Sequence, residues 1–140
     1  MEIINHLSNL ANHYNALLRL TASCFNLTAS QAYTIQNIPY SGISMSQLSK
    51  RLGLDNSTLT RNIQKLEGQG LINRTKNLKD QRVYIVQLTK NGTKIINEID
   101  IRLNEINMSL LKNINVASQE SLSDLLEQLS WSIDCLRELQ

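Results

Sequence analysis

The sequence is poor in residues that interrupt helices and in residues that cross-link a chain. It has one proline, Pro39, and five glycines among 140 residues, so long helices are permitted and collagen-like or low-complexity classes are excluded. Its two cysteines, Cys24 and Cys135, are too few for a disulfide scaffold and lack metal-ligand spacing. Aromatic residues make up only 4% of the chain, so Leu, Ile and Val must form most of the core.

Long apolar runs are missing too. No stretch of about 18 apolar residues is present, and the N-terminus lacks the basic flank and apolar core of a signal peptide. We therefore expect a cytoplasmic protein with no membrane partner.

The residue patterns of catalytic and metal sites are also absent. The sequence shows no paired carboxylates, no Ser-His-Asp or Cys-His arrangement and no glycine-rich phosphate loop, so we predict neither an enzyme nor a cofactor. His6 and His13 lie seven residues apart, about 10.5 Å along a helix, which is too far to share one metal ion. We expect no metal site.

Charge is distributed unevenly, although the net charge is only +2. Residues 44–94 hold ten Lys or Arg and three Asp or Glu, a net charge of +7. The remaining residues hold four basic and nine acidic side chains, a net charge of −5. A basic segment between acidic flanks suggests a module that binds a polyanion such as nucleic acid. A chance cluster of solvated charges is the alternative.

Apolar residues at helical spacing predict helices at both ends of the chain. These are expected over residues 2–20, over a short second segment at 29–38, in a long segment whose apolar stripe runs from Ile95 to Ile114, and from Ser118 to the C-terminus. The long terminal helices carry Leu and Ile stripes that one monomer could not fully cover, which favours a homodimer. A compact monomeric bundle is the alternative.

The middle of the chain predicts two helices joined by a tight turn. Ser44 followed by Gln47 is a capping-box pattern that begins the first helix, and Gly53 ends it. Asp55 can cap the second helix. Together these elements form a helix-turn-helix. The second helix has an apolar stripe formed by Leu59, Ile63 and Leu66. Its opposite face is polar and carries Ser57, Thr60, Arg61, Gln64 and Lys65.

A β-hairpin is predicted directly after the second helix. "LINRT" and "RVYIVQLT" read as two strands joined by "KNLKDQ", and Thr89 is expected to cap the helix that follows. The predicted fold is therefore mainly α with a small β-hairpin wing.

This order of elements, with the motifs "LEGQGLINR", "DQRVYIVQLTKNG" and "LTASQAYTI", resembles the MarR family of bacterial regulators. The second motif fits the family's wing signature of Asp-x-Arg, strand residues, Leu-Thr and a nearby Gly. The resemblance covers nearly the whole chain and implies a single MarR-type domain over residues 1–140. Within it, residues 28–94 would form the winged helix-turn-helix lobe, and residues 1–24 and 95–140 the helical dimerisation region.

The resemblance also implies a function. The expected protein is a homodimeric transcriptional regulator, most simply a repressor, that binds double-stranded DNA at a pseudo-palindromic operator. Binding of this kind is often relieved by a small-molecule effector or an oxidant. The main alternative is a winged-helix adaptor that binds proteins instead of DNA and would carry apolar anchors on the second helix.

The predicted DNA-binding residues lie on both helices and on the wing. Arg61 is the best candidate for pairing with guanine in the major groove, and Arg82, by the family motif, for insertion into a minor groove. Asp80 is expected to support the wing by orienting Arg82 or a neighbouring basic side chain. Arg74 is expected to meet the DNA backbone or pair with Asp80. The full set of DNA-binding residues is Ser46, Asn56, Ser57, Thr60, Arg61, Lys65, Arg74, Lys76, Lys79 and Arg82.

Cys24 is weighed as an oxidant sensor and set aside. It departs from the place of the reactive cysteine in the family, and only Arg19 is near enough in sequence to activate the thiol. We expect a buried, inert thiol. No ligand pocket is assigned, since the tyrosines that would line one are equally explained as packing.

Overall fold

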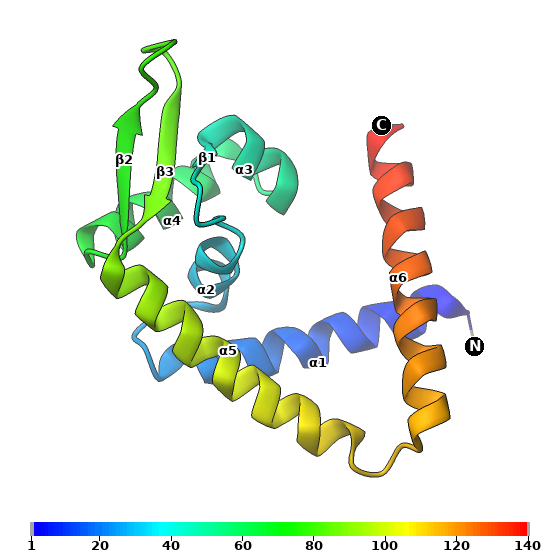
Figure 1. Ribbon diagram of the computed structural model, residues 1–140. Coiled ribbons are helices and arrows are strands. Elements are labelled where there is room, and N and C mark those ends of the chain that lie inside the picture. The colour runs from blue at the N-terminus through cyan, green and yellow to red at the C-terminus, as the bar shows by residue number, and fades with distance from the viewer. Residues whose placement is uncertain (1, 140) are drawn as a thin grey trace. The chain divides into compact units, whose positions relative to one another are not determined.

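The computed structural model describes residues 2–139 as six helices and three short strands (Figure 1). By contact the chain divides into two compact units, one that ends at Arg102 and one that begins at Leu103. The prediction of a mainly α fold with a β-hairpin wing is confirmed. In chain order the elements are α1 (Ile3–Ser23), α2 (Ala29–Gln36), β1 (Ile43–Ser44), α3 (Met45–Leu52), α4 (Asn56–Gly68), β2 (Ile72–Lys76), β3 (Tyr84–Leu88), α5 (Lys90–Leu111) and α6 (Val116–Glu138).

The core of the first unit is almost entirely aliphatic. The stripe predicted on α4 is buried, and so are residues from each of the surrounding elements. With so few aromatics, branched aliphatic side chains supply the packing that fixes α4 in place. Fully buried side chains include Leu18, Ile35, Leu48, Leu59, Ile63, Leu66, Ile72, Val86 and Ile99.

Local capping explains where the helices of this unit begin. The Ser44 hydroxyl accepts a hydrogen bond from the Gln47 N–H at 3.2 Å, and the Gln47 side chain returns to Ser44, which completes the predicted capping box. Gly53 ends α3 with φ of 62°, a left-handed conformation that favours glycine. The Thr89 hydroxyl accepts from the Gly92 N–H at 3.0 Å, which confirms Thr89 as a cap.

The sheet contains a strand that the sequence did not predict. Its order is β1-β3-β2, with all pairs antiparallel, and β1 joins through Ile43 opposite Val86. Because β1 has only two residues, no alternation of polar and apolar side chains could reveal it. Ser44 belongs to β1 and also caps α3, so the strand links the helix pair directly to the wing.

Gly92 marks a close contact at the base of the wing. A Cβ atom built on Gly92 would lie 1.9 Å from the carbonyl oxygen of Leu71. That carbonyl also accepts a hydrogen bond from the Thr89 N–H at 3.0 Å. The start of α5 therefore lies against the start of the hairpin in a way that only glycine permits.

The second unit contains the end of α5 and all of α6. Here α5 ends at Leu111, before the end of the predicted stripe at Ile114, and α6 begins at Val116, so the predicted start at Ser118 is wrong. The Asn115 side chain accepts from the Ser118 N–H at 2.8 Å, which makes Asn115 the cap and Ser118 the third helical residue. No residue of α6 is buried.

Candidate nucleic-acid interface

The outer face of α4 is polar, basic and exposed. Its buried stripe turns the opposite side of the helix outward, so Asn56, Ser57, Arg61 and Lys65 are exposed and Thr60 is half-buried. Asp55, before the helix, and Glu67, near its end, are the acids of this segment. The polar face predicted from the sequence is therefore exposed except at Thr60, which is half-buried.

A buried polar contact joins α4 to α2. Asn62 is only 7% exposed, and its side-chain Nδ2 donates to Ser30 Oγ at 2.7 Å and to Thr34 Oγ1 at 3.1 Å. Thr34 in turn donates to the Ser30 carbonyl at 2.7 Å. A buried amide needs such partners, and these fix where α4 lies against α2. Sequence reasoning missed Asn62; the available signal was its position three residues after Leu59, within the buried stripe.

The N-terminal end of α4 is organised by Asp55. One carboxylate oxygen accepts from the Ser57 hydroxyl at 2.6 Å and from the Thr58 N–H at 3.2 Å. The hydrogen bond from Ser57, followed by those from Thr58, lowers the pKa of Asp55 from 3.8 to about 2. The carboxylate is therefore ionised at neutral pH, and the Ser57 hydroxyl, having donated its proton, offers lone pairs to a ligand.

Two further predicted residues lie beside this helix end. The side-chain oxygen of Asn56 lies 3.2 Å from the Ser49 hydroxyl, which orients the amide and leaves its NH₂ group toward solvent. Ser46 is exposed in the first turn of α3, and its hydroxyl lies 3.3 Å from that of Ser44. Ser44 is committed to capping, so Ser46 is the serine of this pair that is available to a ligand.

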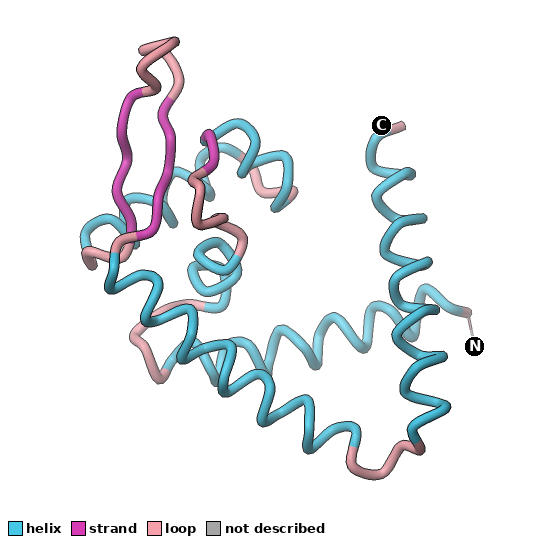
Figure 2. The backbone as a smooth tube through the Cα atoms, in the orientation of Figure 1, coloured by secondary structure: helices cyan, strands magenta, loops and turns pink. Residues whose placement is uncertain are grey.

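The wing ends in a tightly bonded loop, drawn in pink at the end of the hairpin in Figure 2. The Asn77 N–H donates to the Val83 carbonyl at 2.8 Å, and the Val83 N–H donates to the Asp80 carbonyl at 3.0 Å. The Asp80 carboxylate accepts from the backbone N–H of Arg82 at 3.0 Å. Its expected role in orienting a basic side chain stays a prediction. The predicted cations of the wing, Lys76, Lys79 and Arg82, are all exposed.

Arg74 lies at the base of the wing and not near its tip. Its guanidinium pairs with Glu67 of α4, with Nη2 and Nε at 2.9 and 3.0 Å from the same carboxylate oxygen. The predicted pair with Asp80 is wrong. Arg74 lies opposite Val86 in the sheet. The last paired residues of the hairpin, Lys76 and Tyr84, lie between Arg74 and the loop that contains Asp80. Arg74 therefore ties β2 to the end of α4.

Comparison with known proteins identifies this arrangement. Residues 28–84, which hold the helix pair and the wing up to the start of β3, match the family model described as "MarR family". In this part of the chain the sequence is similar to the MarR family.

Solved structures extend the MarR likeness of fold beyond the matched residues. A MarR protein from Peptoclostridium difficile is 22% identical with a TM-score of 0.86, covering 96% of this chain and 88% of its own. A MarR transcriptional regulator from Methanosarcina mazei is 24% identical with a TM-score of 0.84, and the match covers 93% of this chain and 94% of the regulator. A mutant of E. coli MarR complexed with operator DNA is 26% identical with a TM-score of 0.75, and the match covers 90% of this chain and 92% of the MarR chain.

Cys24 is exposed, so the expectation of a buried thiol is wrong. It follows the last residue of α1, where the chain turns, and its thiol lies 3.6 Å from the Leu20 carbonyl. Within residues 2–139 no group of three or more His, Cys, Asp or Glu could hold a metal ion. No helix in that range is long and apolar enough to cross a membrane.

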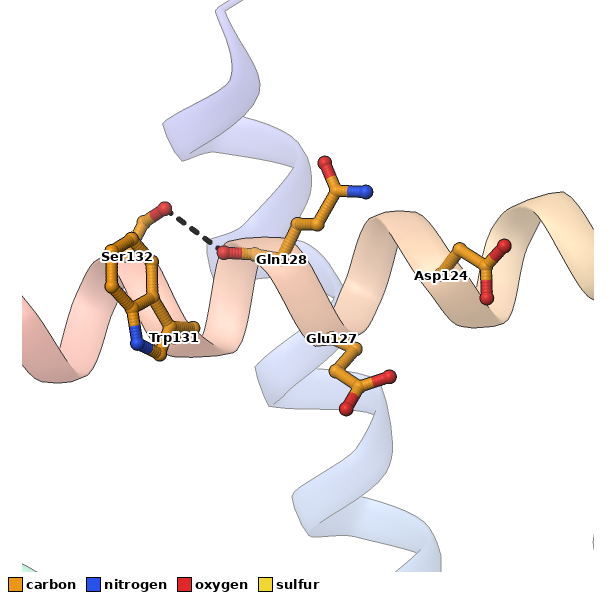
Figure 3. Close-up of a pocket in the computed structure, with 5 residues that line it drawn as sticks. All are labelled: Asp124, Glu127, Gln128, Trp131 and Ser132. Carbon is orange, nitrogen blue, oxygen red and sulfur yellow. Dashed lines mark hydrogen bonds between the residues drawn. The ribbon is translucent and has the colours of Figure 1, made fainter.

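A hollow on α6 also resembles a ligand site. It is lined by Asp124, Glu127, Gln128, Trp131 and Ser132, all from this helix (Figure 3). The Ser132 hydroxyl donates to the Gln128 carbonyl at 2.9 Å, so that hydroxyl is satisfied within the helix. Because one helix supplies every lining residue, nothing encloses a ligand here, and we assign none to it.

Proposed function

We propose that this chain is a MarR-family, sequence-specific transcriptional regulator that binds double-stranded DNA and catalyses no reaction. The observation that carries the proposal is the exposed polar and basic face of α4 beside a stiff wing that presents three cations. The fold shared with an E. coli MarR that is complexed with operator DNA supports it.

In the proposed complex the N-terminal half of α4 lies in the major groove. Arg61 is positioned on the exposed face to pair with the O6 and N7 atoms of a guanine, a contact worth about 1–3 kcal/mol of discrimination. Asn56, Ser57 and Thr60 lie nearer the start of the helix and would contact base edges or phosphates. Lys65, further along, would meet the phosphate backbone, as would Ser46 at the start of α3.

The wing is proposed to reach an adjacent minor groove. Arg82 would enter the groove, where the negative potential is concentrated when A·T-rich sequence narrows it. Lys76 and Lys79 would contact phosphates on either side. Arg74, held by Glu67, would act by keeping the wing at a fixed angle to α4.

We also propose a homodimer built from the terminal helices. A helix such as α6, with no buried residue and with Trp131 70% exposed, gains too little from its own unit to be stable in isolation. A second copy would cover its apolar side and pair two α4 helices about 34 Å apart, as a pseudo-palindromic operator requires. Exposed apolar residues of α6 are Val116, Leu122, Leu125, Leu126, Trp131, Ile133 and Leu136, and Leu139 follows at its C-cap.

Repression is the proposed outcome of binding, because a dimer across a promoter excludes polymerase. A small-molecule effector would relieve repression by binding better to a dimer whose two α4 helices no longer match the half-site spacing. The opposing adaptor hypothesis is disfavoured by the helix pair itself, since none of the exposed large hydrophobic residues lies in α3 or α4.

The decisive experiment is footprinting on the DNA that flanks the protein's own gene, followed by a salt titration. We expect two protected half-sites. A dimer that neutralises about 6–10 phosphates should show log K falling with log salt at a slope of about −5 to −9. Failure to bind any duplex at low salt would refute the proposal.

A further inference from the structure

Leu78 is a fully exposed apolar residue within a cationic loop. Its exposure is 100%, and it lies between Lys76 and Lys79 in the loop that joins β2 to β3. A single exposed leucine on a protein surface ordinarily needs no explanation. This one differs because hydrogen bonds hold the loop around it, and because that loop, drawn in pink between β2 and β3, lies at the far end of the hairpin (Figure 2).

Hydrogen bonds hold the backbone on both sides of Leu78. Before it, the Asn77 N–H donates to Val83, and the Asn77 side chain accepts from the Lys79 N–H at 2.9 Å. After it, Asp80 accepts from both Val83 and Arg82 at 3.0 Å. The loop thus keeps the Leu78 side chain in water, where its hydration is unfavourable, although the apolar strand residues of the hairpin are only a few positions away.

We infer that Leu78 packs against the deoxyribose walls of the minor groove that the wing enters. The inference rests on the proposed DNA-binding function and adds a residue to it. A minor groove is about 6 Å wide and is lined by sugar C–H groups, and minor-groove proteins use leucine among their apolar contacts. The cations at either side would bring the loop to the groove, and Leu78 would then bury its side chain there.

Such a contact has a signature that separates it from the cations. A cation that meets a phosphate releases counterions and steepens the dependence of log K on log salt. Burial of an apolar side chain releases none. Leu78 therefore contributes a constant factor to affinity at every salt concentration, whereas Lys79 and Arg82 contribute to the slope.

The test uses the full chain and the duplex that its footprint protects. Fluorescence anisotropy titrations from about 50 to 200 mM salt compare the parent with Leu78→Asn, which nearly keeps the shape of leucine but is polar, and Leu78→Met, which stays apolar. We expect Leu78→Asn to weaken binding by about tenfold to a hundredfold per dimer at all salt concentrations, with an unchanged slope. Leu78→Met should bind within about threefold of the parent.

Two controls complete the design. Leu78→Lys should steepen the slope by about one per wing, and Lys79→Ala should flatten it by the same amount. Because Leu78 is fully exposed, all its variants should unfold at the parent temperature.

The inference is overturned if Leu78→Asn binds like the parent, or if its deficit appears as a change of slope instead of a constant factor. A parent that binds no duplex would overturn the proposed function itself, and the two failures are told apart by the parent curve alone.

Discussion

In the proposed complex, individual side chains on α4 divide between contacts that would read the base sequence and contacts that would add affinity. Arg61 and Lys65 are both exposed on one face and differ by about one helical turn in position. The planar guanidinium of Arg61 suits bidentate pairing with guanine, while the ammonium of Lys65 suits a phosphate. This difference is testable because the two kinds of contact fail in different ways.

Arg61→Ala should lower operator affinity by about tenfold or more per half-site and lessen the preference for one base pair. Lys65→Ala should weaken binding to all sequences alike and flatten the salt slope by about one per subunit. Competition binding with operators altered at single base pairs measures both effects. Equal loss of affinity for every altered operator on Arg61→Ala would contradict the assignment of Arg61 to a base.

Asp55 gives a pH dependence at the same helix end. Its folded-state pKa is lowered to about 2 from 3.8, chiefly by the hydrogen bond from Ser57. A lowered pKa means that the cap stabilises the fold fully above about pH 4 and loses this contribution as pH falls toward 2. Asp55→Asn keeps an N-cap acceptor without a titrating group, so its unfolding temperature should fall less steeply than that of the parent across this window. Parallel curves for the two proteins would show that Asp55 is not the group responsible.

At the scale of elements, the wing is held to α4 through Glu67 and Arg74. Their pair is at the base of the hairpin, away from the exposed cations of the loop. Arg74→Ala should therefore weaken operator binding by roughly threefold to thirtyfold, by loosening the wing, without altering the salt slope. Glu67→Gln should show the same behaviour although it removes a negative charge. A flatter slope for Arg74→Ala would mean that Arg74 contacts phosphate after all.

The contact at Gly92 predicts a loss of stability with a built-in control. Gly92→Ala places a methyl group 1.9 Å from the Leu71 carbonyl oxygen, so the backbone must move, at a cost of about 1–3 kcal/mol or more. Gly68→Ala meets nothing within 4 Å on α4 and should be neutral or stabilising by up to about 1 kcal/mol. Urea unfolding of both variants measures the difference. A Gly92→Ala protein as stable as the parent would show that the base of the wing readily rearranges.

The helix pair was the most predictable part of the fold, for a physical reason. Capping boxes and glycine turns act within four residues, so Ser44, Gly53 and Asp55 could be assigned from the sequence alone. The partner of Arg74 could not, because the register of β2 on β3 and the end of α4 bring Glu67 to it. For the same reason β1 was missed: its pairing with β3 is set by residues some forty positions away.

The candidate site shows the same division. The exposure of the cations could be predicted from the periodicity of α4 and from the hairpin pattern of the sequence. The position of Asn62 three residues after Leu59 could have indicated its burial, but its contact with Ser30 and Thr34 depends on the packing of α4 on α2. Whether a thiol is buried also depends on tertiary packing, which is why the expectation for Cys24 was wrong.

At the scale of the whole molecule, the proposed function depends on whether two chains associate. In the proposed complex each chain reads one half-site, and a single lobe would bind weakly at physiological salt despite the net charge of +7 over residues 44–94. Coupling two lobes through the terminal helices would make the second contact intramolecular and raise operator affinity steeply. On this proposal the exposed apolar side chains of α6 are as important for DNA binding as the cations of the wing.

Replacing Leu125 with Arg tests this directly. Leu125 is 55% exposed on α6, so the change should leave the secondary structure of the isolated chain intact. A charge buried at a dimer interface without a partner is strongly unfavourable, so we expect the dimer to dissociate in light scattering and operator affinity to fall by about a hundredfold or more. Ser123→Arg, a change from a polar side chain two residues away, is the matched control and should leave both properties near those of the parent. A monomeric parent that still protects two half-sites would contradict the coupling, because each lobe would then be sufficient alone.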